Sequence, residues 1–176
     1  MKNNSDDIVI KPITVDDALL LSDVALRAYK DHYLHLWHEG GEWYMEKSFA
    51  VHNLAAELAS SNSRFFMVYV AGQPAGFIKI NIDAPLEDET NALELERIYF
   101  VKAVNGRGVG TKAMEHIMAI AKGLGKKILW LKVMDSSTAA IAFYKKFGFD
   151  ICGTYRLDFV QMKEELRGMY VMKAAL

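Results

Sequence analysis

Residues 105–111 read Asn-Gly-Arg-Gly-Val-Gly-Thr, and the segments on either side of this glycine-rich stretch decide the fold. The upstream segment, residues 93–101, has the residue pattern of a strand, and downstream Ala113, Ile117 and Ile120 recur at helical spacing. Glycines between a strand and a helix let the backbone approach a ligand closely, and the first helical turn offers unpaired N–H groups to an anion. This glycine loop, residues 105–111, therefore predicts a ligand that contains phosphate.

The order of residues separates the glycine loop from two common phosphate-binding loops. A Walker A loop ends in Gly-Lys-Ser/Thr, whereas Gly110 is followed by Thr111 and Lys112, and Asn105 occupies the place of the first glycine. A Rossmann loop has the spacing Gly-x-Gly-x-x-Gly, which the glycines at 106, 108 and 110 do not share. Taken alone, the stretch is also compatible with an ordinary glycine-rich turn.

A second motif lies downstream, behind the strand-like residues 127–133. Residues 137–149 read Ser-Thr-Ala-Ala-Ile-Ala-Phe-Tyr-Lys-Lys-Phe-Gly-Phe. With the glycine loop they resemble the two hallmarks of the GNAT superfamily of N-acetyltransferases, Gln/Arg-x-x-Gly-x-Gly/Ala and Asn-x-x-Ala-x-x-Phe/Leu-Tyr-x-x-x-Gly-Phe. The chain departs from these patterns at Asn105 and Ser137. The resemblance covers essentially the whole chain and is weakest over residues 30–62.

Composition describes one globular domain, residues 1–176, with 52% hydrophobic and 24% charged residues. A net charge of −1 gives no electrostatic reason to expect a nucleic-acid partner. The absence of a long apolar run or a signal-peptide pattern predicts no membrane partner. A single cysteine, Cys152, excludes an internal disulfide and suits the cytoplasm, where we expect the protein to act.

The order of elements predicts an α/β protein. The resemblance implies the GNAT fold: a mixed, mostly antiparallel, twisted sheet of about seven strands, flanked by about four helices and splayed at the acetyl-CoA site. Expected strands are 8–13, 64–70, 75–82, 93–101, 127–133, one from about 150, and 169–173. Expected helices are 15–29, 49–60, one from the glycine loop to 124, and 137–147.

The resemblance also implies how acetyl-CoA binds as the co-substrate, with no metal. The strand residues Ile98, Tyr99 and Phe100 would hold the pantetheine arm, with the backbone of Ile98 and Phe100 pairing to it like an added strand. Ser137 stands where an asparagine usually bonds the pantetheine amide, and a serine replaces only part of that bonding. The pyrophosphate would lie on the glycine loop, at Gly106, Arg107, Gly108, Val109, Gly110 and Thr111.

Two residues are expected to carry the chemistry. Tyr144 occupies the position of the family's general acid, and an ordinary pKa near 10 keeps a tyrosine protonated; a core tyrosine is the alternative. The resemblance implies Glu96 as the candidate general base, because it lies four residues before Phe100, a position that carries a basic carboxylate in several amine acetyltransferases of the family. Strand alternation places Glu94, Glu96, Ile98 and Phe100 on one side unless a bulge intervenes. The alternative for Glu96 is a salt bridge to Arg97 or another cation.

A histidine series and an aromatic segment give weaker indications of function. His32, His35 and His38 recur every three residues, but no further ligand is spaced to complete a metal site. The aromatic segment around Trp37 and Tyr44, beside the glycine pair 40–41, would either shape an acceptor pocket by cation–π contacts or anchor a long connection.

Residues 65–70, 76–82, 95–99 and 140–149 narrow the resemblance to PaiA-type bacterial polyamine acetyltransferases. This similarity implies transfer to a small amine such as spermidine or spermine, and the acidic residues Glu87, Asp88 and Glu89 give modest support. Two alternatives remain: a peptide N-terminal or lysine acetyltransferase, and a non-catalytic acyl-CoA-binding regulatory protein. Homodimers are common in the superfamily, so a homodimer is one expected assembly.

Overall fold

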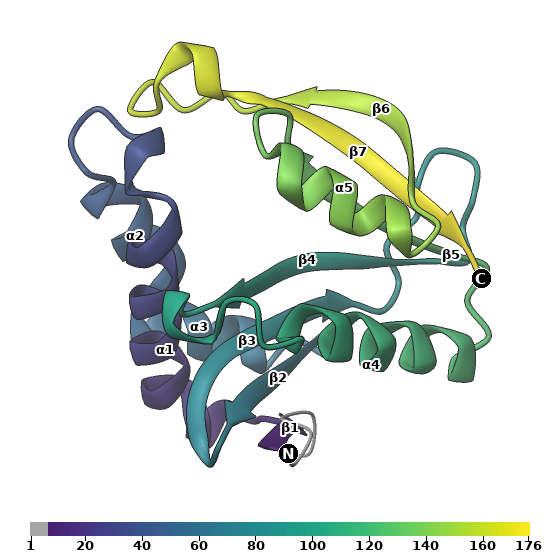
Figure 1. The fold of residues 1–176 in the computed structure, drawn as a ribbon, viewed down its shortest axis with the longest axis horizontal. Coiled ribbons are helices and arrows are strands. Elements are labelled where there is room, and N and C mark those ends of the chain that lie inside the picture. Colours follow the sequence, from purple (N-terminus) through teal and green to yellow (C-terminus); the bar gives the residue numbers. More distant parts are fainter. Residues whose placement is uncertain (1–6) are drawn as a thin grey trace.

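A computed structural model describes residues 7–176 as a central sheet covered by helices on both faces (Figure 1). The strands are β1 (Ile8–Pro12), β2 (Ser63–Val70), β3 (Gln73–Asn81), β4 (Ala92–Phe100), β5 (Ile128–Met134), β6 (Asp150–Arg156) and β7 (Gly168–Ala175). The helices are α1 (Ala18–His32), α2 (Glu42–Phe49), α3 (Val51–Leu58), α4 (Val109–Gly123) and α5 (Thr138–Lys146), with short 3-10 turns at Val15–Asp17, Leu34–Leu36, Lys102–Val104 and Glu164–Leu166.

The seven strands lie in the order β1-β2-β3-β4-β5-β7-β6, and all neighbours are antiparallel except β4 and β5. This parallel pair extends only from Ala92–Ile128 to Leu95–Leu131, so the second half of β4 has no partner on that side. In Figure 1, β6 and β7 diverge from β4 toward the end of the sheet where α1 and α2 lie. The predicted mixed, splayed sheet is therefore confirmed.

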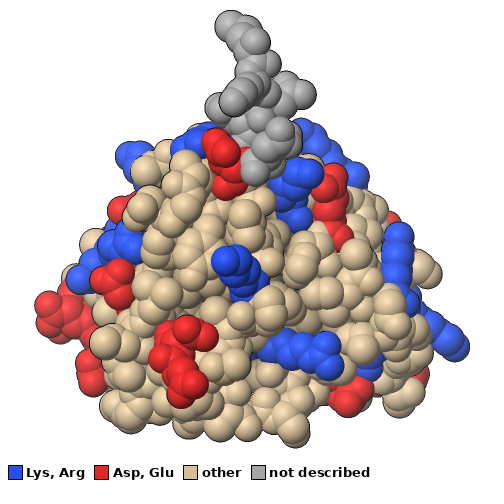
Figure 2. Space-filling view, turned by 90° about the horizontal axis from the view of Figure 1, so that it is seen from below, with Lys and Arg blue, Asp and Glu red and all other residues tan. Residues whose placement is uncertain are grey.

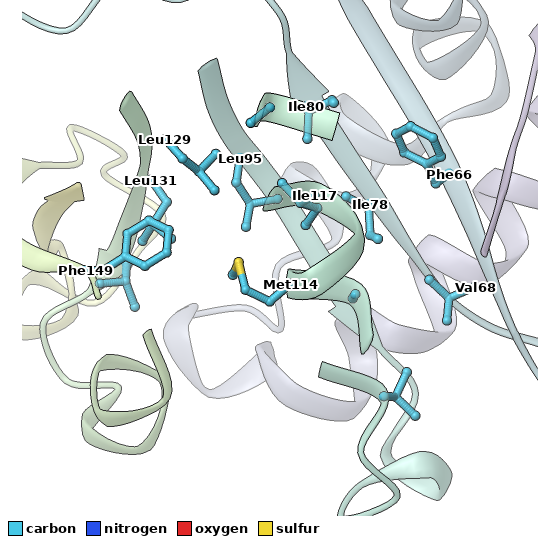
Figure 3. Packing of buried hydrophobic residues seen from close by; sticks show 14 of the residues in the cluster. Phe66, Val68, Ile78, Ile80, Leu95, Met114, Ile117, Leu129, Leu131 and Phe149 are labelled. Atoms are coloured by element: carbon cyan, nitrogen blue, oxygen red, sulfur yellow. The ribbon is translucent and has the colours of Figure 1, made fainter. Parts of the chain in front are cut away.

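Two apolar cores lie on opposite faces of the sheet because strand side chains alternate. Ile78, Ile80 and Leu95 pack against α4, where Met114 and Ile117 are fully buried (Figure 3). Phe149, which follows α5 in the chain, belongs to the same core. The opposite core joins Phe65, Met67 and Phe77 to α1, α2 and α3. The two cores hold β4 between them and so determine where its polar residues point.

The element boundaries differ from the predicted ones in two places. The helix expected over residues 49–60 is observed as α3, which begins just after Ala50, whose extended ψ of 142° separates α3 from α2; α2 itself was not among the expected helices. The side chain of Asn53 donates to the carbonyls of Glu46 and Lys47 at this break, which satisfies the end of α2. The β2–β3 hairpin is also tighter than expected: its turn is Ala71-Gly72, both with positive φ, as a two-residue hairpin turn requires.

Charged side chains are dispersed on the face that lies at the bottom of Figure 1. Figure 2 shows lysine, arginine, aspartate and glutamate scattered among larger uncharged areas of this face. Within residues 7–176, no helix combines the length and the apolar character needed to cross a membrane.

Candidate functional site

A cavity of about 360 Å³ lies where β4 parts from β5. Its wall combines the splayed strands with α1, α5, the segment after α1 and the segment between β6 and β7. The lining residues are Tyr29, Tyr33, Leu36, Trp37, Tyr44, residues 94–99, residues 131–134, Ser137, Ala140, Tyr144, Tyr155, Leu157, Phe159, Met162 and Met169. The cavity is thus largely aromatic and apolar, with carboxylates contributed by β4.

A β-bulge in β4 determines which side chains reach each face. Lys79 pairs with Arg97, whereas the next residue of β3, Ile80, pairs with Leu95, so Glu96 is the extra residue. The bulge inverts the alternation: Leu95 and Ile98 both face the α4 core, and Arg97 points to the α3 side. The bulge therefore breaks the alternation expected for Glu94, Glu96 and Ile98: Ile98 faces the α4 core, whereas Glu94 and Glu96 both lie within reach of the Asn81 side chain.

Glu96 belongs to a compact ion-pair cluster. Its carboxylate contacts the ammonium of Lys79 and lies 3.7 Å from Nε of Arg97. Lys79 also lies 2.9 Å from Glu57 of α3, and Arg97 donates to both oxygens of Glu57 at 2.8 and 3.2 Å. The side chain of Lys79 is only 7% exposed, so Glu96 supplies a counter-charge that a nearly buried ammonium needs.

Glu94 has different surroundings, although it lies only two residues away. Its Oε2 accepts a hydrogen bond of 2.9 Å from Nδ2 of Asn81, and no cationic nitrogen of residues 7–176 lies within 4.0 Å of it. Burial raises the pKa of Glu94 above its ordinary value, and the negative charge of Glu96 adds to this, while Asn81 opposes it.

Tyr144 lies on the wall formed by α5. Burial, with a smaller contribution from Tyr33, raises the pKa of the Tyr144 hydroxyl above its ordinary value. The hydroxyl is therefore protonated throughout the neutral range and available as a proton donor inside the cavity.

The glycine loop has the geometry of an anion site. Gly106 and Gly108 have φ angles of 75° and 77°, and a Cβ at either position would meet nothing within 4 Å. Lys112 makes the first i to i−4 bond of α4, to Gly108, which leaves the N–H groups of residues 108–111 at the open helix start. The N–H of Arg107 is an exception to the expected donor set, because it donates to Val104 at 3.3 Å.

Packing links the glycine loop to the second motif. A Cβ on Gly110 would come within 3.3 Å of the ring of Phe143, so this glycine allows α4 and α5 to approach closely. Phe143 precedes Tyr144, and Ser137 lies just before α5 on the cavity wall. The structure therefore brings Tyr144, Ser137 and residues 98–99 to one cavity, with the glycine loop beside it.

The end of α1 fastens the segment between β4 and the glycine loop. Nε2 of His32 lies 3.0 Å from the carbonyl oxygen of Phe100, and the carboxylate of Asp31 accepts the N–H of Lys102 at 2.8 Å. His32 is thus a structural partner of β4. Among residues 7–176, no group of three or more His, Cys, Asp or Glu side chains is arranged to hold a metal ion.

The aromatic segment after α1 is both a packing anchor and part of the cavity wall. Trp37 is buried, and its Nε1 donates to the Tyr29 hydroxyl at 2.9 Å. A Cβ on Gly41 would approach the Trp37 ring to 2.5 Å, so this glycine makes room for a ring. Tyr33 and Tyr44 line the cavity, so this segment anchors the connection and also contributes to the cavity wall.

The acidic loop does not contribute to the cavity. Glu87, Asp88 and Glu89 are absent from its wall. Sequence reasoning also missed Lys79 and Asn81. An isolated lysine in the apolar strand residues 76–80 was the one available signal, since a buried lysine needs an anionic partner. Nothing in the sequence distinguishes Asn81 from a surface residue.

The profile of the Acetyltransferase (GNAT) family matches residues 25–149, which include β2 to β5, the glycine loop and α5. The chain belongs to the GNAT family. This match confirms the family to which the two motifs pointed, and it includes the cavity residues on β4, β5 and α5.

Among individual GNAT relatives, an uncharacterized N-acetyltransferase in the pepI 3' region of Lactobacillus delbrueckii subsp. lactis is 33% identical over 107 residues. The match covers 60% of this chain and 62% of that protein. The chain thus spans about six tenths of the length of this relative.

Solved structures share the GNAT fold at lower identity. The PaiA N-acetyltransferase from Thermoplasma acidophilum, in complex with coenzyme A, has a TM-score of 0.75 and 21% identity, with 96% of this chain and 99% of that chain covered. Ribosomal-protein-alanine N-acetyltransferase from Brucella melitensis has a TM-score of 0.73 and 20% identity, with the same coverage. At these identities the similarity establishes the fold.

Proposed function

We propose that this protein transfers the acetyl group of acetyl-CoA to a primary amine. The observation that carries the proposal is the unpaired second half of β4, which borders a cavity lined by Tyr144 and two carboxylates. An extended acyl carrier can add to such a strand edge through backbone hydrogen bonds. Membership of the GNAT family supports the same activity.

Binding of acetyl-CoA is assigned to the residues that the motifs indicate. The N–H groups of residues 108–111 would hold the pyrophosphate at the positive end of α4, and the side chain of Arg107 would add a charge-assisted contact. Gly106 keeps the approach to this helix end open. Ile98, Tyr99 and Phe100 would bind the pantetheine arm from β4, with Ser137 facing it from the start of α5.

Proton transfer requires an acid and a base within the cavity. Tyr144 is the proposed acid, because its buried hydroxyl remains protonated until a thiolate forms. The base must take a proton from an acceptor that is cationic at neutral pH, and the two carboxylates of the cavity wall are Glu94 and Glu96. The sequence favoured Glu96, which is paired with Lys79 in the structure, whereas Glu94 is hydrogen-bonded to Asn81.

A polyamine such as spermidine or spermine is the proposed acceptor class. The resemblance of residues 65–99 to PaiA-type enzymes supports it, as do the carboxylates of β4 and the tyrosine rings, which attract ammonium groups. Glu94 is the cavity carboxylate without a cationic partner among residues 7–176. It is therefore the group best suited to attract the first ammonium of such a substrate.

The test is release of the CoA thiol from acetyl-CoA in the presence of single acceptors. A panel of spermidine, spermine, a monoamine, a lysine peptide and a peptide with a free N-terminal alanine separates the acceptor classes. We expect the highest kcat/KM with a polyamine. Faster transfer to a peptide would replace the polyamine assignment, and CoA binding without turnover on any amine would indicate the regulatory alternative.

A further inference from the structure

The hydrogen-bond pattern of β4 determines which of its backbone groups face the open side of the sheet. Val101, just after β4, donates its N–H to the carbonyl of Ala75 at 2.8 Å, directly across the β3–β4 pair. Bonded and non-bonded residues alternate in an antiparallel pair, so the N–H and C=O groups of Ile98 and Phe100 point away from β3. The pairing of β4 with β5 ends at Leu95, so these groups form a free edge.

Two side chains of α1 occupy the far end of this free edge. Nε2 of His32 lies 3.0 Å from the carbonyl oxygen of Phe100, and because a carbonyl only accepts, Nε2 is the donor. The next outward amide is that of Lys102, which donates to the carboxylate of Asp31 at 2.8 Å. The two backbone groups that an extended ligand would reach after the Phe100 N–H are therefore already bonded.

The end of α1 is anchored by aromatic packing. Tyr29, in the preceding turn, is buried. The ring of Tyr33 lies against the ring of His32, with a centroid distance of 6.1 Å, and also contacts the ring of Tyr99 on β4. This packing needs no ligand, so Asp31 and His32 form a fixed point beside β4.

We propose that Asp31 and His32 form a stop on the free edge of β4, which fixes the register of acetyl-CoA. With this stop in place, the pantetheine arm pairs with the N–H and C=O of Ile98 and with the N–H of Phe100, and no further. Asp31 and His32 are positioning residues, since they act through the backbone of β4. This assignment rests on the proposed function, through the binding of acetyl-CoA to β4.

A register error at this edge would withdraw the reacting group from the cavity. The glycine loop follows β4 in the chain and the cavity lies at the bulge end, so the pantetheine arm would run from the loop toward Glu96. The arm is flexible, and holding its pyrophosphate on the loop does not by itself set the register. A slip to Phe100 and Lys102 spans two strand residues, about 7 Å, and would separate the thioester from Tyr144.

The decisive experiment compares CoA affinity with turnover in His32→Ala. Loss of the imidazole frees the Phe100 carbonyl for the ligand, so one hydrogen bond replaces another and the Kd of CoA, measured by calorimetry, should change by less than about threefold. Turnover should fall about 10- to 100-fold, because misplacement by an ångström can cost about 100-fold. A loss of affinity that parallels a lower melting temperature would indicate a merely structural role and overturn the stop.

Conservative variants separate the hydrogen bonds from the shapes of the side chains. His32→Gln retains an N–H donor and Asp31→Asn retains an acceptor oxygen, so both should keep most of the turnover that the alanine variants lose. The matched control is His35→Ala, since His35 is exposed and lies outside the cavity wall. Equal turnover in His32→Ala and His35→Ala would contradict the proposal.

Amide exchange of Lys102 tests the stop without any turnover. In the wild type this N–H is bonded to Asp31, so its protection should be the same with and without CoA. In the double variant Asp31→Ala/His32→Ala, it should exchange rapidly in the free protein and more slowly with CoA, because the ligand can now reach it. Rapid exchange in both states of the double variant would show that the ligand does not advance past Phe100, and the stop would be refuted.

The two proposals fail in different ways. If the wild type transfers acetyl to no amine, the proposed function falls, while the exchange of Lys102 with CoA still tests the stop. If the wild type is active and His32→Ala keeps both its affinity and its turnover, only the stop falls.

Discussion

At the scale of single residues, burial makes Tyr144 and Glu94 chemically complementary. Low solvent exposure raises the pKa of both side chains. For the tyrosine this keeps a proton in place for donation, and for the carboxylate it strengthens the affinity for a proton. Burial therefore favours the protonated form of both side chains.

Replacing Tyr144 by phenylalanine removes the proton donor and keeps the ring. We expect turnover to fall at least about tenfold, a low bound for general acid catalysis, with little change in acetyl-CoA affinity. Release of the CoA thiol measures turnover, and calorimetry measures the affinity for acetyl-CoA. Tyr69→Phe is the control, because Tyr69 lies on β2 outside the cavity wall and should keep full activity. Full turnover in Tyr144→Phe would mean that another group protonates the thiolate.

At the scale of elements, the glycine loop and the bulge of β4 position the two halves of the proposed acetyl-CoA site. The loop leaves the start of α4 open. The bulge at Glu96 shifts the pairing of residues 97–100 with β3 by one residue relative to the first half of β4. Each feature rests on local backbone geometry, so each is sensitive to single substitutions.

The glycine loop can be tested with Gly108→Val. A valine side chain would occupy the open space beside the helix start and exclude the pyrophosphate, so acetyl-CoA affinity should fall sharply. Gly125→Val is the matched control: its φ of 70° imposes similar backbone strain, also in open space, at the far end of α4. Unchanged affinity in a folded Gly108→Val protein would remove the loop from the site.

The ion-pair cluster makes stability depend on pH. Burial alone would raise the pKa of Glu57, but Arg97 and Lys79 outweigh it and hold the pKa below its ordinary value. The resulting stabilisation is complete above the ordinary pKa of 4.5 and is lost as the pH falls through the lower, folded-state pKa.

Glu57→Gln should therefore lower the free energy of unfolding at neutral pH. We expect about 2 kcal/mol, below the roughly 3–5 kcal/mol for a fully buried pair, because the Glu57 side chain is 27% exposed. Urea unfolding at pH 7 and at pH 3 measures the effect, and the difference between wild type and variant should shrink at the lower pH. An equal difference at both values would contradict the ionic explanation.

At the scale of the whole molecule, the proposed CoA site lies where the sheet is splayed, so CoA binding should stabilise the folded state. A ligand that binds only the folded state at 100 times its Kd stabilises it by about 2.7 kcal/mol, which is roughly 5–10 °C in a domain of this size. We expect this rise with CoA for the wild type and little rise for Gly108→Val.

Hydrogen exchange shows which part of the protein CoA stabilises. With CoA bound, the amides of β4 after Leu95 that are not bonded to β3 should exchange more slowly, since a ligand strand would pair with them. Amides between β5 and β7 are the internal control, because those strands are paired along their full length. Uniform protection without a local change on β4 would place the ligand elsewhere.

Local patterns in the sequence determined most of the fold and indicated the candidate site residues. Glycine spacing and helical periodicity located the glycine loop and the start of α4, and residues 137–149 located Tyr144. These features depend on residues close together in the chain, whose conformational preferences can be recognised without a partner. All seven strands were predicted, with ends that differ by a few residues.

Only the tertiary structure decided which carboxylate is free. The bulge at Glu96 arises from its register with β3, and the partners Glu57, Lys79 and Asn81 come from segments 13 to 39 residues away from the β4 carboxylates. Such contacts have no local signature, because burial and charge pairing depend on which strands and helices meet. Helix α2 (Glu42–Phe49) also escaped prediction, because its buried residues Met45 and Phe49 are defined by packing in the core on the α1 side and not by a strong local pattern.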